Sequence, residues 1–509
     1  MKAAWTAAAE SASDPVLAHA RPMLRRTKIV ATLGPATDDP AVLAQLLRAG
    51  ANVVRVNFSH GATDDIRRRV RLVRDVALNV GREVGVLGDL RGPKIRIRRF
   101  AEGKVELTRG DRFVLDAGLG EREGTADAVG VTYAQLARDV APGDVLLLDD
   151  GHIVLDVESI DDARVICHVS VGGTLSDAKG INRQGGGLSA AALTEKDRED
   201  IRTAAELELD FLAVSFPRDA TDIGLARQLF REAGGAGLIV AKIERAEAVR
   251  NIESIIDASD VIMVARGDLG VEVGYAELTG LQKRIIRLTR THNRIVITAT
   301  QMMESMIGSP IPTRAEVADV ANAVMDGTDA VMLSGETAVG RYPVKVIEAT
   351  AEVCRGAEKH HLSRGRSSHR LDDSFRYVDE AIAMAVMYTA NHLQVTAIIA
   401  LTESGSTALW MSRIRSDIPI YAFTRHAATR RRVTLYRGVY PVSFDIVDTD
   451  ARVLYQEIFH KLLDLDLVKV DDLVIFTKGD LTGVSGGTNA MKILKVRDER
   501  EARSEPLAQ

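Results

Sequence analysis

Short apolar segments recur along the first two thirds of the chain, and most are followed by a polar or glycine-rich turn and an amphipathic stretch. Strands that alternate with helices in this way predict βαβ units and a parallel sheet. Eight such units predict a closed (β/α)8 barrel. The eight predicted strands are Lys28–Leu33, Val53–Phe58, Val84–Asp89, Phe211–Phe216, Leu238–Ile243, Val261–Ala265, Ile295–Thr300 and Ala330–Leu333.

The regular spacing breaks once, between the third and fourth predicted strands. Residues 98–187 alternate apolar and polar positions, with turns at Gly110, Pro142–Gly143 and Asp150–Gly151. This pattern is typical of antiparallel strands. We therefore expect an all-β domain inserted into a barrel made of residues 25–97 and 188–353. It leaves the barrel at a strand end, where it can serve as a lid, and the segment Gly185–Ser189 is its expected hinge.

Beyond residue 353 a polar linker, HHLSRGRSSHRLDDS, leads into a region with a different pattern. Helical stretches separate four further predicted strands, so residues 354–509 are expected to form an open α/β domain. Residues 1–24 are rich in alanine and lack the apolar core of a signal peptide, which predicts a loosely ordered extension. The four strands are Thr396–Leu401, Pro419–Phe423, Val439–Phe444 and Asp472–Phe476.

Composition excludes several functions. The 509 residues carry a net charge of −5 with both signs mixed, and aromatic residues make up 4%. Neither property suits a nucleic-acid-binding protein. No apolar run reaches the roughly 18 residues that span a bilayer, so no membrane association is expected. The two cysteines, Cys167 and Cys354, are too few for a disulfide framework, and we expect a cytoplasmic location.

Charged residues stand where two successive predicted strands end. Lys242 and Glu244 close the first of these strands, and Arg266 and Asp268 follow the second. In this type of barrel the carboxyl ends of the strands hold the catalytic groups. Two carboxylates and a lysine suit a divalent cation, Mg²⁺ or Mn²⁺, and an anionic substrate. Further residues at the strand ends are Thr32, Pro35, Arg55, Asn57, Ser59, His60, Asp89, Arg91, Lys94, Arg96, Ser215, Arg218, Thr300, Ser334 and Glu336.

Each of these residues also has an ordinary structural explanation. Arg55 and Lys242 could form salt bridges, Asp268 could cap a helix or form a turn, and His60 could be a solvated turn residue. Their recurrence at the same end of successive strands favours a shared site. The chain contains no Walker-type phosphate loop and no G-x-G-x-x-G opening a βαβ unit. A bound nucleotide would therefore use another binding mode.

Several long motifs resemble those of the pyruvate kinase family, and the resemblance covers nearly the whole chain from Thr27. It implies a barrel with an inserted β lid and a C-terminal α/β domain. It also implies transfer of the phosphoryl group of phosphoenolpyruvate to ADP, giving pyruvate and ATP. The motifs are TKIVATLGPAT (27–37), NVVRVNFSHG (52–61), GDLRGPKIR (88–96), AKIERAEAVRNI (241–252), VARGDLGVEV (264–273), TATQMMESMI (298–307), PTRAEVADVANAVMDGTDAVMLSGETAVGRYP (312–343) and TESGSTA (402–408).

The resemblance implies a role for individual residues. Glu244 and Asp268 would ligate the divalent metal, and Lys242 and Arg55 would contact the transferring phosphoryl group. The backbone at Arg266, Gly267 and Asp268 would hold the substrate carboxylate. Thr300 would help to protonate the enolate, with Ser334 and Glu336 as relay partners. The nucleotide side would comprise Pro35, Asn57, His60, Arg96 and Lys196, while Asp65 replaces the family's aromatic residue there and removes the expected stacking partner of adenine.

One departure from the family pattern concerns K⁺. Many members carry Asp-Thr-Lys-Gly-Pro-Glu and need K⁺, whereas this chain reads Asp89-Leu90-Arg91-Gly92-Pro93-Lys94. The ammonium of Lys94, with Asn57, Ser59 and Asp89 nearby, would supply the charge of the monovalent cation. We therefore expect that K⁺ is not required. The alternative is that Lys94 points into solvent.

The last domain contains a candidate effector loop, Thr402, Glu403, Ser404, Gly405, Ser406 and Thr407, which follows a predicted strand and opens a helix. Backbone N–H groups there can bind a phosphate, although an ordinary capped loop would look the same. The resemblance favours a regulatory anion, with AMP or a sugar monophosphate expected before fructose bisphosphate. Lys478–Gly479 and residues 483–488 are expected to follow another strand end and close over it.

Two alternative functions are consistent with part of the pattern. Another phosphoenolpyruvate-using barrel, of a carboxylate-transferring or mutase type, would not need the lid or the nucleotide side. A catalytically silent regulatory homologue would have lost Lys242, Glu244 or Asp268, and all three are present. The homotetramer that we expect follows from the family resemblance alone.

Overall fold

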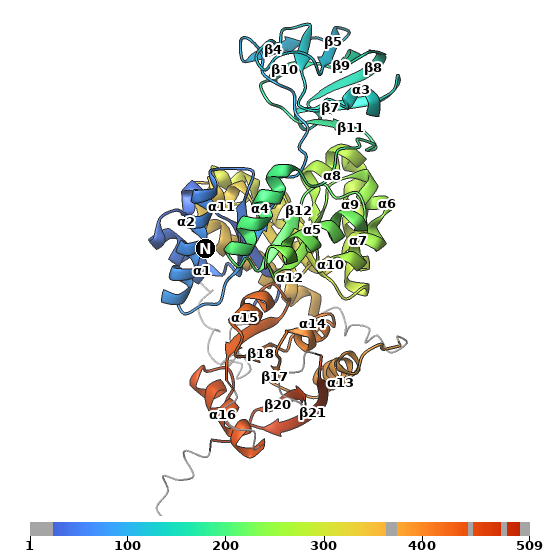
Figure 1. Cartoon of the computed structure of the whole chain (residues 1–509). Coiled ribbons are helices and arrows are strands. Elements are labelled where there is room, and N and C mark those ends of the chain that lie inside the picture. Colours follow the sequence, from blue (N-terminus) through green and yellow to red (C-terminus); the bar gives the residue numbers. More distant parts are fainter. Residues whose placement is uncertain (1–23, 363–373, 446–450, 480–485, 499–509) are drawn as a thin grey trace, which may run out of the picture.

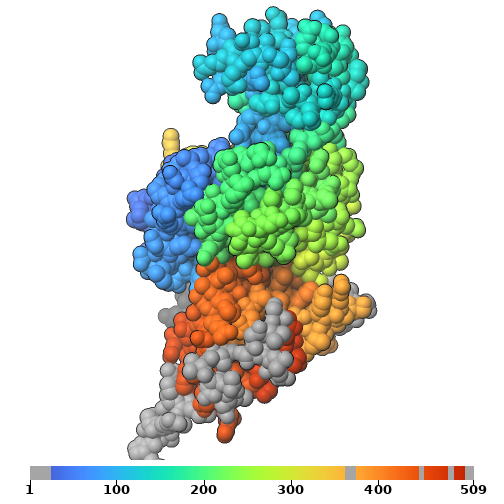
Figure 2. Space-filling model, viewed as in Figure 1, coloured from blue at the N-terminus to red at the C-terminus, as the bar shows by residue number. Residues whose placement is uncertain are grey.

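The computed structural model describes residues 24–362, 374–445, 451–479 and 486–498. Residues 1–23 of the expected extension, and the linker residues 363–373, lie outside this part. Three domains follow one another along the long direction of the molecule (Figure 1), with the lid at one end of the barrel and the C-terminal domain at the other. Figure 2 shows that the lid joins the barrel through a narrow neck.

The central domain is a closed parallel barrel of eight strands, as the sequence predicts. Nearly all of its strand residues are buried, because helices cover the outside and side chains fill the interior. Observed strands end up to two residues before the predicted bounds, where the chain turns into the loops. The strands are β1 (Lys28–Thr32), β2 (Val53–Asn57), β3 (Gly85–Asp89), β12 (Phe211–Val214), β13 (Leu238–Ile243), β14 (Val261–Ala265), β15 (Ile295–Ala299) and β16 (Ala330–Leu333).

The helices around the barrel begin at recognisable caps. Asp39 accepts a hydrogen bond from the N–H of Ala41 at the start of α1. Thr194 and Thr313 form capping boxes with Asp197 and Glu316. Each such cap contributes about 1 kcal/mol. The helices are α1 (Pro40–Ala49), α2 (Thr63–Asn79), α4 (Glu195–Glu206), α5 (Ala220–Glu232), α6 (Ala246–Arg250), α7 (Ile252–Ala258), α8 (Arg266–Val273), α9 (Tyr275–Thr291), α10 (Arg314–Asp326), α11 (Gly335–Ala338) and α12 (Pro343–Leu362), with 3₁₀ turns at Pro35–Thr37 and Glu304–Ile307.

The inserted domain between β3 and β12 is built from strands, with only the short helix α3 (Leu136–Asp139) and a 3₁₀ turn at Asp149–Gly151. Its strands form a two-stranded and a six-stranded sheet around a separate apolar core. The two connections to the barrel lie side by side, since Arg96 and Gly180 form an antiparallel bridge. The strands are β4 (Lys104–Leu107), β5 (Arg112–Asp116), β6 (Ala128–Gly130), β7 (Val145–Leu148), β8 (Ile153–Asp161), β9 (Arg164–Val171), β10 (Gly173–Ser176) and β11 (Ile181–Arg183).

The C-terminal domain is an open sheet in the order β19-β18-β17-β20-β21. The four predicted strands are present, and β21 is an antiparallel edge strand that the sequence analysis missed. Lys478 and Gly479 belong to β20 and do not follow it, so that expectation was wrong; residues 480–485 lie outside the described part. The elements are α13 (Val378–His392), β17 (Ala397–Leu401), α14 (Ser406–Ser412), β18 (Ile420–Thr424), α15 (Ala427–Val433), β19 (Val439–Ser443), α16 (Ala451–Asp464), β20 (Leu473–Gly479) and β21 (Thr488–Lys495).

Three ion pairs attach the C-terminal domain to the amino ends of the barrel strands, one of them between Arg430 and Glu83 at 2.6 Å. Arg413 and Asp329 pair at 2.5 Å with both side chains buried, and Arg431 pairs with Asp210 at 2.8 Å. Each aspartate directly precedes a barrel strand. The C-terminal domain therefore covers the face opposite the lid. Within the described part of the chain, no helix combines the length and apolar character needed to cross a membrane, and Cys167 and Cys354 are free and buried.

Candidate active site

Asp89 joins the two cations at the carboxyl ends of the barrel strands. Its Oδ2 lies 2.7 Å from Nε of Arg55, and its Oδ1 lies 3.2 Å from Nζ of Lys242. Asp89 is the last residue of β3, and its side chain is 1% exposed. Arg55 also donates to Oγ1 of Thr32. One carboxylate therefore fixes an arginine and a lysine beside each other at the mouth of the barrel.

Lys242 is held as a cation. Its Nζ lies 2.9 Å from Oε1 of Glu244 and donates to Oγ of Ser215 at 2.6 Å. Burial would lower the pKa of Lys242, but the charges of Asp89 and Glu244 outweigh burial and raise that pKa. Burial would likewise raise the pKa of Asp89, but Lys242 and Arg55 lower it. At neutral pH Lys242 can therefore attract an anion but does not serve as a proton donor.

Glu244 and Asp268 are the two carboxylates that could hold a divalent cation. Glu244 is 2% exposed, and its Oε2 accepts a hydrogen bond from the N–H of Phe216. Burial raises the pKa of Glu244; Lys242 opposes this rise, and Asp268 adds to it. A cation between the two carboxylates would relieve their repulsion. Among the described residues no group of three or more acidic, histidine or cysteine ligands occurs, so substrate oxygens and water would complete the shell, as Mg²⁺ prefers.

Thr300 and Gly267 form a second part of the site. The N–H of Gly267, in the first turn of α8, donates to Oγ1 of Thr300 at 2.9 Å. Thr300 has a φ of +68° and Gln301 a φ of +52°, both in the left-handed region that non-glycine residues seldom occupy. The chain therefore turns sharply after β15 and brings the Thr300 hydroxyl to the start of α8.

The side chain of Arg266 stabilises this turn. It donates to the carbonyl oxygens of Ala299 at 3.1 Å and Thr300 at 2.6 Å, and its NH1 pairs with Asp319 of α10 at 2.7 Å. Because the guanidinium is engaged in this way, only the backbone of Arg266 remains for a substrate. Neither motif nor spacing singled out Asp319, since its importance depends on a contact between residues 53 positions apart.

Ser334 and Glu336 lie at the neighbouring strand end. Glu336 is 2% exposed, and its carboxylate accepts hydrogen bonds from the N–H of Met303 at 3.1 Å and of Ser334 at 2.6 Å. It therefore joins the loop after β15 to the loop after β16. Both carboxylate oxygens of Glu336 are engaged in this way, so its role in holding the two loops competes with the expected proton relay.

The predicted nucleotide residues lie in separate elements. Asn57 ends β2, and its Oδ1 accepts the N–H of Ser59, while the N–H of His60 donates to the carbonyl of Asn57. Pro35 begins the 3₁₀ turn after β1. The described contacts of Arg96 and Lys196 do not include the cluster around Lys242: Arg96 donates to the carbonyl of Ala178 in the lid, and Lys196 pairs with Asp200 of its own helix.

Lys94 lies on the chain that leads into the lid. Its Nζ is 3.6 Å from Oδ1 of Asp268, with side-chain exposures of 33% and 24%. Lys94 therefore faces the proposed metal ligand, while Asp89 contacts Arg55 and Lys242, and Asn57 contacts Ser59. The expected grouping of Lys94 with Asn57, Ser59 and Asp89 does not appear as direct contacts among the described residues.

The candidate effector loop connects β17 to α14. Gly405 adopts a φ of +87° at the start of α14. Thr402 accepts a hydrogen bond from the N–H of Gly405, and Thr407 bonds to Thr488 at the start of β21. Glu403 lies 3.8 Å from Arg425 and contacts His426. The start of β21 thus borders the loop, and the guanidinium of Arg425 offsets part of the charge of Glu403.

The barrel, its lid and the cluster of Lys242, Glu244, Asp268 and Arg55 define a class of protein: a barrel enzyme that binds an anion beside a divalent cation. The chain matches the model of the pyruvate kinase barrel domain over residues 24–347 and that of the pyruvate kinase alpha/beta domain over residues 380–494. It is 57% identical to Pyruvate kinase II of Salmonella typhimurium over 477 residues, covering 93% of this chain and 99% of that one.

Other relatives agree. The chain is 54% identical to a pyruvate kinase of Haemophilus influenzae, covering 90% of this chain and 96% of that one. A solved structure of a pyruvate kinase from Cryptosporidium parvum superposes with a TM-score of 0.86 at 32% identity, covering 93% of this chain and 96% of that one. The chain belongs to the pyruvate kinase family.

Proposed function

We propose that this protein transfers the phosphoryl group of phosphoenolpyruvate to ADP, giving pyruvate and ATP, the last step of glycolysis. The observation that carries the proposal is the Lys242 ammonium, held between Asp89 and Glu244 beside Arg55. A fixed pair of cations can offset the charge that develops on a transferring phosphoryl group. Because they are already in place, little reorganisation is needed during the reaction.

The remaining roles are proposed on the family resemblance, and the positions of the residues support them. The substrate phosphoryl group would lie against Lys242 and Arg55, and the carboxylate against the backbone of the first turn of α8, where the N–H of Gly267 would be shared with Oγ1 of Thr300. Glu244 and Asp268 would hold Mg²⁺ or Mn²⁺, which supplies further positive charge to the phosphate oxygens. The family resemblance suggests ADP near Pro35, Asn57, His60, Arg96 and Lys196.

Loss of the phosphoryl group leaves the enolate of pyruvate, which takes up one proton at carbon to give the product. Thr300 is the proposed hydroxyl in this step, directly or through water, because the start of α8 and the Arg266 side chain hold its loop in place. Ser334 and Glu336 are proposed to fix the neighbouring loop, with a relay role left to Ser334.

Three further properties are proposed rather than derived from the geometry. Lys94 replaces K⁺, the loop Thr402–Thr407 binds AMP or a sugar monophosphate, and the protein is a cytoplasmic homotetramer. Support for the first is the Lys94–Asp268 pair. Support for the second is the open start of α14 and its contact with β21. The tetramer and the location rest on the family resemblance.

A coupled assay of pyruvate formation from phosphoenolpyruvate, ADP and Mg²⁺ tests the activity. We expect turnover that depends on all three, and the variant Lys242→Met should reduce kcat by about 10³-fold or more with an unchanged fold. Near-normal turnover of that variant would refute the role of Lys242. Consumption of phosphoenolpyruvate without ADP would favour a carboxylate-transferring or mutase-type enzyme. Complete inactivity of the folded wild type would favour a catalytically silent homologue.

A further inference from the structure

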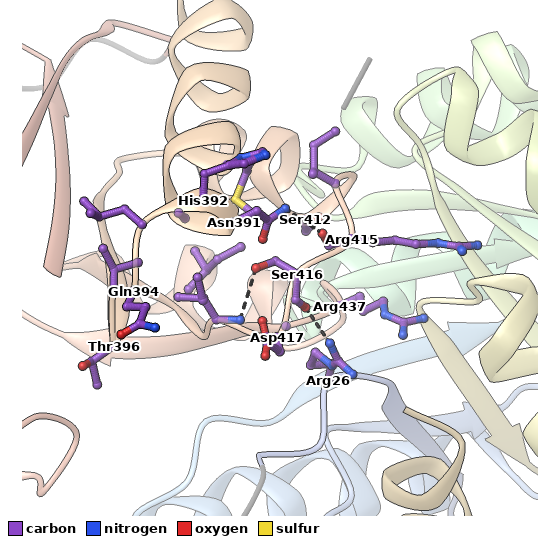
Figure 3. Close-up of a pocket in the computed structure, with 18 of the residues that line it drawn as sticks. Arg26, Asn391, His392, Gln394, Thr396, Ser412, Arg415, Ser416, Asp417 and Arg437 are labelled. Carbon is purple, nitrogen blue, oxygen red and sulfur yellow. Dashed lines mark hydrogen bonds between the residues drawn. The ribbon is translucent and has the colours of Figure 1, made fainter. Parts of the chain in front are cut away.

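A large cavity lies between the barrel and the C-terminal domain, on the face opposite the lid. Its volume is about 640 Å³, which is within the range of small-molecule sites. The end of α13, the segment between α14 and β18, and the residues just before β19 surround it, and Arg26 reaches it from the barrel (Figure 3). Arg290 of α9 also lines it from the barrel side. None of the residues discussed for catalysis or for the 402–407 loop is among its described lining residues.

The lining of this cavity is strongly cationic. Four arginines, Arg26, Arg290, Arg415 and Arg437, line it, and Asp417 is the one carboxylate among the described lining residues. Figure 3 shows Arg26, Arg415 and Arg437 along the side that faces the barrel. A concentration of guanidinium groups on one wall is the arrangement that recognises phosphate.

Part of this positive charge is not neutralised by the protein. Arg26 pairs with Glu358 at 3.6 Å. By contrast, Arg290 donates to the carbonyl oxygens of Gly327 and Arg413, and Arg437 to those of Val324 and Thr328. The ion pairs found among the described residues include neither of these two arginines. Carbonyl groups orient a guanidinium but carry no net charge that would offset it.

The energetic cost of this arrangement appears in the pKa values. Burial lowers the pKa of Arg290 to about 9, and repulsion from Arg413 and Arg437 adds to the decrease. Burial also lowers the pKa of Arg437 and of Arg415, although Glu358 and Asp326, respectively, act in the opposite direction. A bound anion would reverse part of this effect.

The rest of the wall suits the body of a small organic molecule. Gln394 and Thr396 present polar side chains, and Leu393, Val395 and Ile418 supply apolar surface. Asn391 already donates to the carbonyl of Arg415, and Arg26 donates to that of Ser416. These bonds tie the segment that carries Arg415 to both α13 and the barrel, so the wall is fixed before a ligand arrives.

We propose that this interdomain cavity is a binding site for a phosphate group, carried by inorganic phosphate or by a small phosphorylated metabolite, with Arg290, Arg415 and Arg437 as its cationic ligands. The site is separate from the active site and from the 402–407 loop. A ligand there contacts residues of both domains and holds them together.

Isothermal titration calorimetry of the full-length protein in EDTA, with inorganic phosphate and with glycerol 3-phosphate, tests the proposal. We expect saturable binding that weakens with added NaCl. Arg415→Gln should weaken it at least about fivefold because a charge-assisted contact is lost. Asp417→Asn should strengthen it because the one lining carboxylate is neutralised. Tighter binding of glycerol 3-phosphate than of inorganic phosphate would indicate that the natural ligand is a small phosphorylated metabolite. The reverse order would indicate that it is inorganic phosphate.

Three control variants locate the binding. Arg71→Gln removes an exposed arginine of α2, Ser404→Ala alters the 402–407 loop, and Lys242→Met alters the active site; each should keep the binding that Arg415→Gln weakens. Asp417 is exposed and Arg415 is exposed in part, so their variants are expected to fold, and circular dichroism checks this. Absence of binding to the wild type would overturn the proposal. Wild-type affinity in both cavity variants, or loss of binding in Ser404→Ala or Lys242→Met, would also overturn it.

Discussion

The ammonium of Lys94 lies 3.6 Å from Oδ1 of Asp268, so a residue at the base of the lid is ion-paired with a proposed metal ligand. This places the fixed positive charge at the metal side of the site. The two side chains are roughly a quarter to a third exposed, so solvent screens the ion pair moderately. The pair therefore matters more for the net charge at the metal site than for the free energy of unfolding.

Replacement of Lys94 tests whether this charge substitutes for K⁺. We expect the wild type to be active in tetramethylammonium buffer without K⁺, with less than about a twofold change when K⁺ is added. Lys94→Met should lose activity in that buffer, and K⁺ should restore part of it because a cation can occupy the vacated position. Arg91→Gln, three residues earlier, is the matched control. A wild type that works only with K⁺ would contradict the prediction.

The two proposed metal ligands should differ in their sensitivity to substitution. Asp268→Asn is expected to raise the Mg²⁺ concentration for half-maximal activity by about 10- to 100-fold, as losses at a metal site commonly do. Glu244→Gln should cost more, since it also disturbs Lys242 and the N–H of Phe216. Activity titrations with Mg²⁺ and Mn²⁺ measure the effect. An unchanged half-saturation in Asp268→Asn would remove Asp268 from the metal site.

Asp319 is predicted to act as a positioning residue. Asp319→Asn removes the ion pair between Asp319 and Arg266. The Arg266 side chain donates a hydrogen bond to the carbonyl oxygen of Thr300, so this loop would be held less firmly. The expected result is a fall in kcat of about 10-fold with a small change in KM, because a misplaced catalytic group affects the chemical step. Asp326→Asn, at the end of the same helix, should leave kcat unchanged. Equal loss of kcat in both variants, or a lowered thermal midpoint without loss of kcat, would contradict a positioning role.

Glu272 makes the junction between barrel and lid sensitive to pH. Its carboxylate accepts the N–H of Ala246, its backbone carbonyl accepts the N–H of Gly185 in the hinge segment, and burial raises its pKa to about 7. The folded protein therefore holds this proton more tightly than the unfolded chain does. The contribution of Glu272 to the free energy of unfolding is complete below pH 4.5. About 3 kcal/mol of this contribution is lost as the pH rises to 7.

The variant Glu272→Gln keeps a hydrogen-bond acceptor for the N–H of Ala246 but has no side-chain group that titrates. Its thermal midpoint should match that of the wild type near pH 5 and exceed it near pH 8, as measured by calorimetry. Glu247→Gln provides the comparison, since Glu247 also contacts the hinge segment through Gly187. A constant difference between Glu272→Gln and wild type across this range would show that Glu272 does not titrate as described.

The sequence was sufficient for the architecture and for the central cluster because both depend on local pattern. Eight apolar runs predicted the barrel, and the charged residues at their ends predicted that Lys242, Glu244 and Asp268 would share a face. The edge strand β21 was missed because its sequence, TNAMKILK, mixes polar and apolar residues, as edge strands often do. The binding partners of a charged side chain were harder to predict, since they depend on distant elements.

Arg266 and Glu336 illustrate this limit. Arg266 was expected to hold the substrate through its backbone, and Glu336 was expected to act as a relay partner. The sequence did not predict that the Arg266 side chain pairs with Asp319, or that Glu336 accepts two backbone N–H groups. A charged residue beside a site can either touch the ligand or hold the residues that do. Distinguishing the two cases requires the positions of carbonyl and N–H groups in the loops, which no periodic pattern encodes.

The bridge between Arg96 and Gly180 has a consequence for how the chain folds. β3 and β12 are neighbours in the barrel, although Leu87 pairs with Phe211 across more than a hundred intervening residues. Bringing such distant segments together from an unfolded chain carries a loop-closure penalty that grows with loop length and slows folding. Once the lid has folded on its own core, its two ends are adjacent and the effective loop is short. Folding of the lid should therefore precede barrel closure, and a destabilised lid should delay the appearance of the active site.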